Sequence, residues 1–354
     1  MPEGVGKQRP YENSGIARPA PFCPLSPVPG LPTPDETMPT YWQLLLIILP
    51  VFGLIGIGVI IRRVHWIEGE AETSLIRLVV NLCYPCLIFE SVTGNAALRE
   101  PGNVLLPPLL GFGTSALGIA LCLYLGRTVL GLTVGTGLRT FALATGICNY
   151  GYLALPVTTA IWGRETQGVL MVHNVGAEAA VWTVGVLVLS GLSFREGWHR
   201  LLNPIVITLF VAIGVNLSGL SGHVPGVVMN MVHLLAVCMI PIGLLMVGVS
   251  LASYLNGLGD LFRPKVTLGA VVLRLGLLPV LILCMARWLP CSVELKRVLV
   301  VQAAMPSGVF PIVLARHYGG QPMTAVQIVL GTTALGIFTI PLWIHVGLAW
   351  VGVS

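Results

Sequence analysis

The sequence predicts an all-α polytopic membrane protein of ten transmembrane helices, arranged as two inverted five-helix repeats. Of its 354 residues, 55% are hydrophobic and 9% charged, and the mean hydropathy is +0.88. A water-soluble domain has about 25% charged residues, so this chain cannot cover a surface that faces water. Its apolar residues fall into ten runs of membrane length. Two of these runs carry the same Gly/Pro interruption, about 155 residues apart.

The first 40 residues have a different composition from the rest of the chain. Ten of them are proline, a pattern that builds neither helix nor sheet, so we predict a disordered N-terminal tail. The tail has no charged segment followed by an apolar core, and therefore it is not a signal peptide. Met38 directly precedes the first apolar run, and we hypothesise that translation begins there.

Ten hydrophobic runs follow the tail, and each is long enough to span a bilayer. They lie at 41–62, 71–93, 103–127, 138–162, 166–191, 201–221, 226–254, 264–288, 294–316 and 321–350. The first predicted repeat occupies residues 41–191, and the second occupies residues 201–352. A short cytoplasmic linker at 192–200 joins them.

The prolines indicate the repeat. Three pairs, Pro85 with Pro241, Pro156 with Pro311 and Pro107 with Pro264, are separated by 156, 155 and 157 residues. Because each half has an odd number of spans, the second half must enter the membrane from the opposite side. This is the inverted-topology repeat of many secondary transporters.

The basic residues predict the orientation in the cell membrane. Loops of one side hold nine lysines and arginines and loops of the other side hold five, which favours both termini on the outer side. The nine are Arg62, Arg63, Arg127, Arg139, Arg195, Arg200, Arg263, Lys265 and Arg316. The five are Arg99, Arg164, Arg287, Lys296 and Arg297.

Several function classes are excluded by composition and motif. The net charge of +5 comes from basic residues scattered at span ends, so no nucleic-acid partner is predicted. The pair Cys83 and Cys86 lies in an apolar run with no second pair nearby, which indicates packing rather than a redox or metal site. The chain also has no HExxH and no GxSxG motif, so we predict neither an enzyme nor a cofactor.

The two interruptions carry the functional prediction. They read NYGYLALP at Asn149–Pro156 and AMPSGVFP at Ala304–Pro311. A proline inside a helix lacks the N–H that bonds four residues back, so Pro156 is expected to free the carbonyl of Tyr152, and Pro311 that of Ser307. Such groups survive in hydrocarbon only inside protein or beside a wet cavity. A matching pair of broken helices indicates a transporter's substrate site.

Several motifs together resemble those of the auxin efflux carrier (PIN-like) family. They are the two interruptions, NLCYPCLIF at 81–89, PIGLL at 241–245 and LARHYGG at 314–320. The resemblance covers about residues 41 to 350. The short loop at 192–200 resembles the bacterial-type branch.

The resemblance implies that helices four and nine are broken and cross beside the substrate. It also implies transport of small organic anions such as malonate, malate or auxin-like carboxylates. Spans one, two, six and seven would form a scaffold, and the other six would form a moving bundle. Homodimers are expected for this family.

The predicted substrate-binding residues are those of the interruptions. Half-helix N-termini suit a carboxylate, and glycine lets the backbone approach a ligand closely. Three side chains, of Asn149, Tyr150 and Ser307, add neutral donors and acceptors. The full set is Asn149, Tyr150, Gly151, Pro156, Pro306, Ser307, Gly308 and Pro311. The alternative is that the prolines only kink two packed helices.

Glu178 is the second candidate, for ion coupling or substrate contact. It lies in the middle of the run 166–191, where a carboxylate costs about 2.5–3.5 kcal/mol to insert. Asn174 is four residues away on the same face, and His173 lies near it. The alternative is a neutral glutamic acid, or a structural ion pair with Arg274 in the run 264–288.

Three further residues are candidates for ion coupling or substrate contact, namely Asn174, His173 and Glu90, and the last two have a second interpretation. Glu90, at the end of the second run, either faces the central cavity or marks an interface. His173 is either a packing residue or a ligand contact.

We therefore predict a secondary active transporter that moves a small organic anion across the lipid bilayer by alternating access. A proton or a sodium ion is the candidate coupling ion. Two alternatives stay open, a passive anion channel or facilitator and a sodium-coupled symporter of the bile-acid symporter type.

Overall fold

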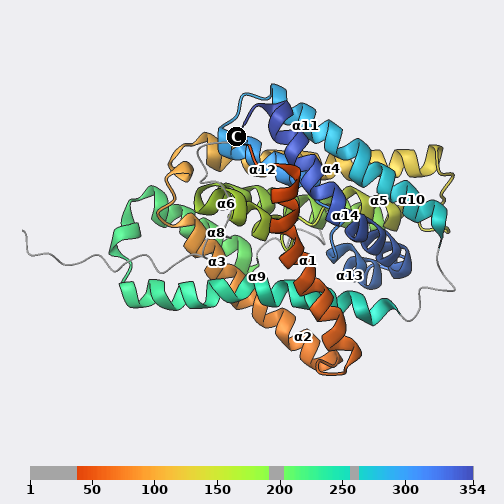
Figure 1. Cartoon of the computed structure of the whole chain (residues 1–354), viewed down its shortest axis with the longest axis horizontal. Helices are drawn as coiled ribbons and strands as arrows, with labels where there is room; N and C mark the ends of the chain where they lie inside the picture. Colours follow the sequence, from red (N-terminus) through yellow and green to blue (C-terminus); the bar gives the residue numbers. More distant parts are fainter. Residues whose placement is uncertain (1–37, 191–202, 256–262, 354) are drawn as a thin grey trace, which may run out of the picture. The chain divides into compact units, whose positions relative to one another are not determined.

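A computed structural model describes residues 38–190, 203–255 and 263–353 (Figure 1). Within these ranges the regular structure is helical, apart from one isolated β-bridge. The protein is therefore an all-helical, multi-pass membrane protein, as the composition predicts. Residues 1–37 of the predicted tail 1–40, and the linker at 192–200, lie outside the described residues.

The first half of the described chain holds seven α-helices. They are α1 (Tyr41–Arg63), α2 (Gly69–Leu78), α3 (Tyr84–Val92), α4 (Gly102–Thr128), α5 (Leu138–Gly146), α6 (Ala154–Ala180) and α7 (Val186–Ser190). Local chemistry fixes where helices begin: Thr40 and Gln43 form a capping box before α1, with Thr40 N donating to Gln43 Oε1 at 2.8 Å.

The second half of the described chain holds another seven. They are α8 (Pro204–Leu217), α9 (Gly226–Leu255), α10 (Pro264–Val272), α11 (Leu278–Trp288), α12 (Val293–Ala304), α13 (Phe310–His317) and α14 (Pro322–Val351). The Asn203 side chain caps α8 by accepting from Val206 N at 3.0 Å, and Ser292 caps α12 in the same way.

Seven helical stretches among the described residues are long and apolar enough to cross a membrane. They are Tyr41–Arg63, Gly69–Val92, Gly102–Thr128, Ala154–Ser190, Gly226–Leu255, Pro264–Trp288 and Pro322–Val351. The stretch Ala154–Ser190 changes direction at Gly163, where φ is 70° and ψ is −151°. It therefore contains parts of two predicted runs, and the count of ten spans stays a prediction.

Three π-helical turns interrupt the long stretches, at Val79–Cys83, Val181–Gly185 and Leu273–Leu277. A π-turn leaves backbone carbonyls poorly bonded, and Trp343 Nε1 donates to the carbonyl of Leu275 at 2.6 Å. The first of these turns directly precedes α3, whose second residue is Pro85.

The three proline pairs differ in local structure. Pro85 starts a helix after a π-turn, whereas α9 continues through Pro241. Pro107 lies inside α4, whereas Pro264 begins α10. Only Pro156 and Pro311 occupy comparable positions, so equal spacing in sequence does not give equal structure for the other two pairs.

Small residues let the long helices approach each other, and the contact of α1 with α9 shows this most clearly. A Cβ built on Gly58 would lie 2.2 Å from the carbonyl oxygen of Leu245. A Cβ on Gly248 would lie 2.0 Å from the carbonyl oxygen of Ile55. The helix α4 packs on α6 through Gly111 and Gly176 in the same manner.

Gly58→Leu should destabilise the protein by about 1–3 kcal/mol or more, because its new side chain meets backbone rather than a movable side chain. The measurement is thermal unfolding of the purified protein in detergent. Gly56→Leu is the matched control, since Gly56 lies on the same helix with nothing within 4 Å of its Cβ position. Equal melting temperatures for the two variants would contradict this account of the packing of α1 on α9.

Candidate functional site at the crossing of two interrupted helices

The two interruptions lie against each other. The first separates α5, which ends at Gly146, from α6, which begins at Ala154. The second separates α12, which ends at Ala304, from α13, which begins at Phe310. These segments are non-helical over several residues, so the prolines do more than kink two continuous helices.

Backbone hydrogen bonds join the two interruptions. Cys148 and Ser307 form an antiparallel β-bridge. Asn149 N donates to the carbonyl of Pro306 at 2.7 Å, and Gly308 N donates to the carbonyl of Ile147 at 3.1 Å. Each segment thereby supplies hydrogen-bond partners for backbone N–H and C=O groups of the other segment, which have no partner within a helix. We call residues 147–153 and 305–309 the crossover.

The prolines act differently from the expectation. Pro156 is the third residue of α6 and Pro311 the second residue of α13, where a backbone N–H has no acceptor within the helix. The prediction placed these two prolines inside helices, and this placement is wrong, because each lies in the first turn of a helix. The release of the carbonyls of Tyr152 and Ser307 stays a prediction. The chain has already left the preceding helix, and each proline instead begins the next one.

The two glycines of the predicted site have different surroundings. A Cβ on Gly308 would lie 2.9 Å from the carbonyl oxygen of Cys148, so this glycine allows the protein's own backbones to meet. A Cβ on Gly151 would meet only the hydroxyl of Tyr84, at 3.9 Å. Room for an added carbon atom beside the backbone is therefore found at Gly151 and not at Gly308.

Two predicted polar side chains of the crossover are buried with bonding capacity to spare. The amide of Asn149, 5% exposed, makes no hydrogen bond to another described residue. Ser307 is fully buried, and its hydroxyl also has no partner among the described residues. A buried polar group without a partner costs free energy, so a ligand that bonds to it gains affinity.

Glu178 is hydrogen-bonded to the first interruption. The hydroxyl of Tyr150 donates to Glu178 Oε2 at 3.0 Å, and Trp182 Nε1 donates to Glu178 Oε1 at 3.0 Å. Asn174 Nδ2 donates to the carbonyl of Tyr150 at 2.9 Å. Three predicted residues are thus joined through Tyr150, whose carbonyl accepts from Asn174 and whose hydroxyl donates to Glu178.

Gln302 extends this network to the second interruption. Its Nε2 donates to Asn174 Oδ1 at 2.9 Å, and its Oε1 accepts from Cys148 Sγ at 3.2 Å. Gln302 lies in the last turn of α12, in a stretch that reads as ordinary apolar helix. The sequence reasoning missed both Gln302 and Cys148. A lone amide inside the run 294–316 was the available signal.

Arg274 is buried and bonded to backbone carbonyls. Its Nε donates to Met305 O at 2.9 Å and its Nη2 to Gln302 O at 3.1 Å, while its Nη1 lies 3.5 Å from Gly146 O. The proposed ion pair with Glu178 is therefore wrong, because the two groups have different partners. The guanidinium sits at the ends of α5 and α12, positions that sequence spacing could not show.

The two other candidates make no hydrogen bond to this network. Glu90 Oε1 lies 2.7 Å from His233 Nδ1 on α9, and the Glu90 carbonyl accepts from Arg164, which also donates to Thr93 O at 2.7 Å. Glu90 thus marks an interface between helices. His173 is buried, and neither ring nitrogen makes a hydrogen bond within the described part of the chain.

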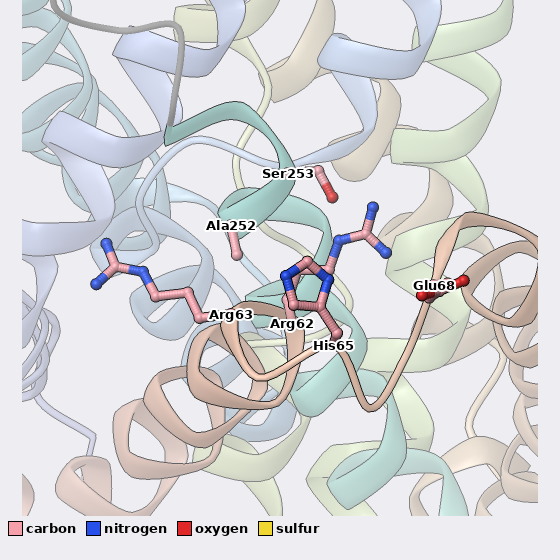
Figure 2. Close-up of a pocket in the computed structure, with 6 residues that line it drawn as sticks. All are labelled: Arg62, Arg63, His65, Glu68, Ala252 and Ser253. Carbon is pink, nitrogen blue, oxygen red and sulfur yellow. The ribbon is translucent and has the colours of Figure 1, made fainter.

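A pocket of about 400 Å³ lies at the ends of α1 and α9 and shares no lining residue with the crossover. Its lining side chains are those of Arg62, Arg63, His65, Glu68, Ala252 and Ser253 (Figure 2). The guanidinium groups of Arg62 and Arg63 point in different directions (Figure 2). Arg62 Nη1 also donates a hydrogen bond to the carbonyl of Ile67 at 2.8 Å. Among the described residues, no group of three or more His, Cys, Asp or Glu could hold a metal ion.

Apolar membrane helices around two interrupted helices, with buried polar groups where these meet, define a membrane transporter. Comparison with protein families agrees: a family model described as "Membrane transport protein" matches residues 44–193 and 190–344. The chain belongs to this family, the auxin efflux carrier (PIN-like) family.

Curated relatives match the chain over most of its length. An "Uncharacterized transporter" of Methanothermobacter thermautotrophicus is 27% identical over 312 residues, 84% of this chain and 96% of the relative. A "Putative malonate transporter" of Rhizobium meliloti is 27% identical over 315 residues, 83% of this chain and 92% of the relative. The family and these relatives are transporters and not enzymes.

Proposed function

We propose that the protein is a secondary active transporter that binds a small organic anion at the crossover and moves it by alternating access. The observation that carries this proposal is the pairing of Cys148 with Ser307. It joins the two segments that lead into α6 and α13, and Asn149 follows Cys148 directly in the first of them. Helix N-termini and neutral donors suit a carboxylate.

The Rhizobium meliloti relative, described as a "Putative malonate transporter", supports a carboxylate as the substrate class. Within the proposal the crossover set acts on substrate, and Glu178 with Asn174 takes part in coupling. Tyr150 belongs to both sets of residues, because its carbonyl accepts from Asn174 and its hydroxyl donates to Glu178. Glu90 and His173, which lie outside the hydrogen-bond network, are not given a role in it.

The finer architecture belongs to the same proposal. The ten apolar runs would be ten spans in two inverted repeats, with both termini outside the cell membrane and the chain assembled as a homodimer. Helices of the described chain occur at each of the ten runs, and the turn at Gly163 supports two spans between residues 138 and 190.

A proton is the coupling ion we propose, carried by Glu178. Its two oxygens each accept one hydrogen bond from a neutral donor, and no cation is bonded to it within the described residues. A carboxyl group in that setting can hold or release a proton without breaking an ion pair. Sodium coupling and passive conduction would show in the same transport assay as dependence on sodium or as absence of saturation.

A screen of thermal stability with acetate, malonate and malate at two pH values tests the proposal. We expect one of these carboxylates to stabilise the purified wild-type protein. The Asn149→Ala variant should need at least about tenfold more of that carboxylate for the same stabilisation, because the buried amide that would bond to it is lost. A tenfold change corresponds to about 1.4 kcal/mol. Asn230→Ala, an exposed amide on α9, is the matched control and should bind as the wild type does. Stabilisation by none of the carboxylates would overturn the proposed substrate class.

A further inference from the structure

We propose that Arg274 sets the fixed charge of the crossover and thereby makes it selective for an anion. This inference rests on the proposed function, because it concerns the same site. Arg274 lies in none of the sequence motifs of the crossover. It stands in the π-helical turn Leu273–Leu277, between α10 and α11.

The surroundings of Arg274 show a charge with no acid to neutralise it. The side chain is 2% exposed. All three of its hydrogen bonds go to backbone carbonyls, those of Gly146, Gln302 and Met305. Within the described residues Arg274 forms no ion pair, whereas Arg62 pairs with Glu72 and Glu90 with His233. Both oxygens of Glu178 are held by Tyr150 and Trp182 instead.

The acceptors of Arg274 belong to two helix C-termini. Gly146 is the last residue of α5, and Gln302 and Met305 flank the end of α12. A helix C-terminus carries roughly half a negative unit charge, and a cation there is favourable. One guanidinium therefore bonds to two helix C-termini, whose combined charge without it is about −1.

The other two helix ends at the crossover have the opposite sign. The N-termini of α6 and α13 each carry roughly half a positive unit charge. Without Arg274 the four helix ends would sum to about zero, and the crossover would not discriminate by charge. With Arg274 the C-terminal ends are balanced, and the two N-terminal ends leave about one positive charge. While Glu178, which is bonded to Tyr150 of the crossover, is protonated, that positive charge matches one carboxylate.

Lysine separates this charge role from a purely mechanical one. A lysine keeps the positive charge but is a compact point charge that cannot reproduce the planar fork of an arginine. If Arg274 only holds α5 against α12, both the lysine and the glutamine variant should lose stabilisation by malonate. If Arg274 supplies charge, the lysine variant should keep stabilisation by malonate and the glutamine variant should lose it.

The test compares wild type, Arg274→Lys and Arg274→Gln in thermal stabilisation by sodium malonate and by its uncharged analogue malonamide, at constant sodium chloride. We expect the wild type to respond to malonate only and the lysine variant to need at most about threefold more of it. The glutamine variant should need at least about tenfold more. Arg287→Gln, which removes a charge from the outer end of the same helical stretch, should match the wild type.

Each result decides between the proposals. A glutamine variant that binds malonate as the wild type does overturns the charge role while the proposed function stands. A lysine variant that is folded but does not recognise malonate, or that is as unfolded as the glutamine variant, also overturns it. A wild-type protein that responds equally to malonate and malonamide contradicts the proposed function itself, and the charge role with it.

Discussion

Glu178→Gln should abolish the dependence of carboxylate uptake on a pH gradient. The physical reason is that a carboxamide cannot take up or release a proton, whereas it nearly keeps the size of the carboxyl group. With one proton carried per anion, a gradient of one pH unit can drive up to about tenfold accumulation. The measurement is uptake of a labelled carboxylate into proteoliposomes, with and without an imposed gradient.

The glutamine variant keeps part of the local structure. Its carbonyl oxygen can still accept from Trp182 or from Tyr150, but its NH₂ group cannot accept from the other. One buried donor loses its acceptor, at a cost of about 1–3 kcal/mol, and downhill exchange should survive at a lower rate. Loss of gradient dependence together with retained exchange would distinguish a coupling defect from unfolding.

Glu165→Gln is the matched control for this experiment. Glu165 lies on the same helix, two residues after the turn at Gly163, and its side chain is exposed. This variant should respond to the gradient as the wild type does. If Glu178→Gln also responds normally, Glu178 has no part in coupling, and a sodium-dependent or passive mechanism takes precedence.

The interruptions could be predicted from sequence because their causes are local. Proline and glycine restrict or free the backbone wherever they stand, so Pro156, Pro311 and Gly308 mark breaks without knowledge of the fold. The residues at which the preceding helices end could not be predicted from the sequence. Which residue ends α5 or α12 depends on what bonds to the released carbonyls, and those partners lie in the other half of the chain.

The charged residues show the same limit more clearly. Glu178 is predicted to be costly inside a membrane, and an ion pair with Arg274 is one alternative that would offset this cost. The structure satisfies each group with neutral partners instead, Tyr150 and Trp182 for the acid and three carbonyls for the base. Sequence spacing cannot show this, because backbone carbonyls are present at every position and only the fold decides which ones are exposed to a donor.

Gly308→Val should abolish transport by separating the two interruptions. The new Cβ would lie 2.9 Å from the carbonyl oxygen of Cys148, a backbone atom of the β-bridge that cannot move aside. Separation would lengthen the bonds from Asn149 N to Pro306 O and from Gly308 N to Ile147 O, which are now 2.7 and 3.1 Å. Each lost bond leaves buried polar groups unpaired, at about 1–3 kcal/mol, so the ligand-free protein should also melt at a lower temperature.

Gly151→Ala provides the contrast within the same crossover. Its Cβ would meet the hydroxyl of Tyr84 at 3.9 Å, an ordinary contact, so the ligand-free protein should melt as the wild type does. If substrate occupies that space, the added methyl group should weaken carboxylate binding alone. The two glycines would then separate two functions of the crossover: Gly308 lets the protein's backbones pair, and Gly151 leaves room for the substrate. A Gly308→Val protein with wild-type stability and transport would show that the pairing of Cys148 with Ser307 does not support the site.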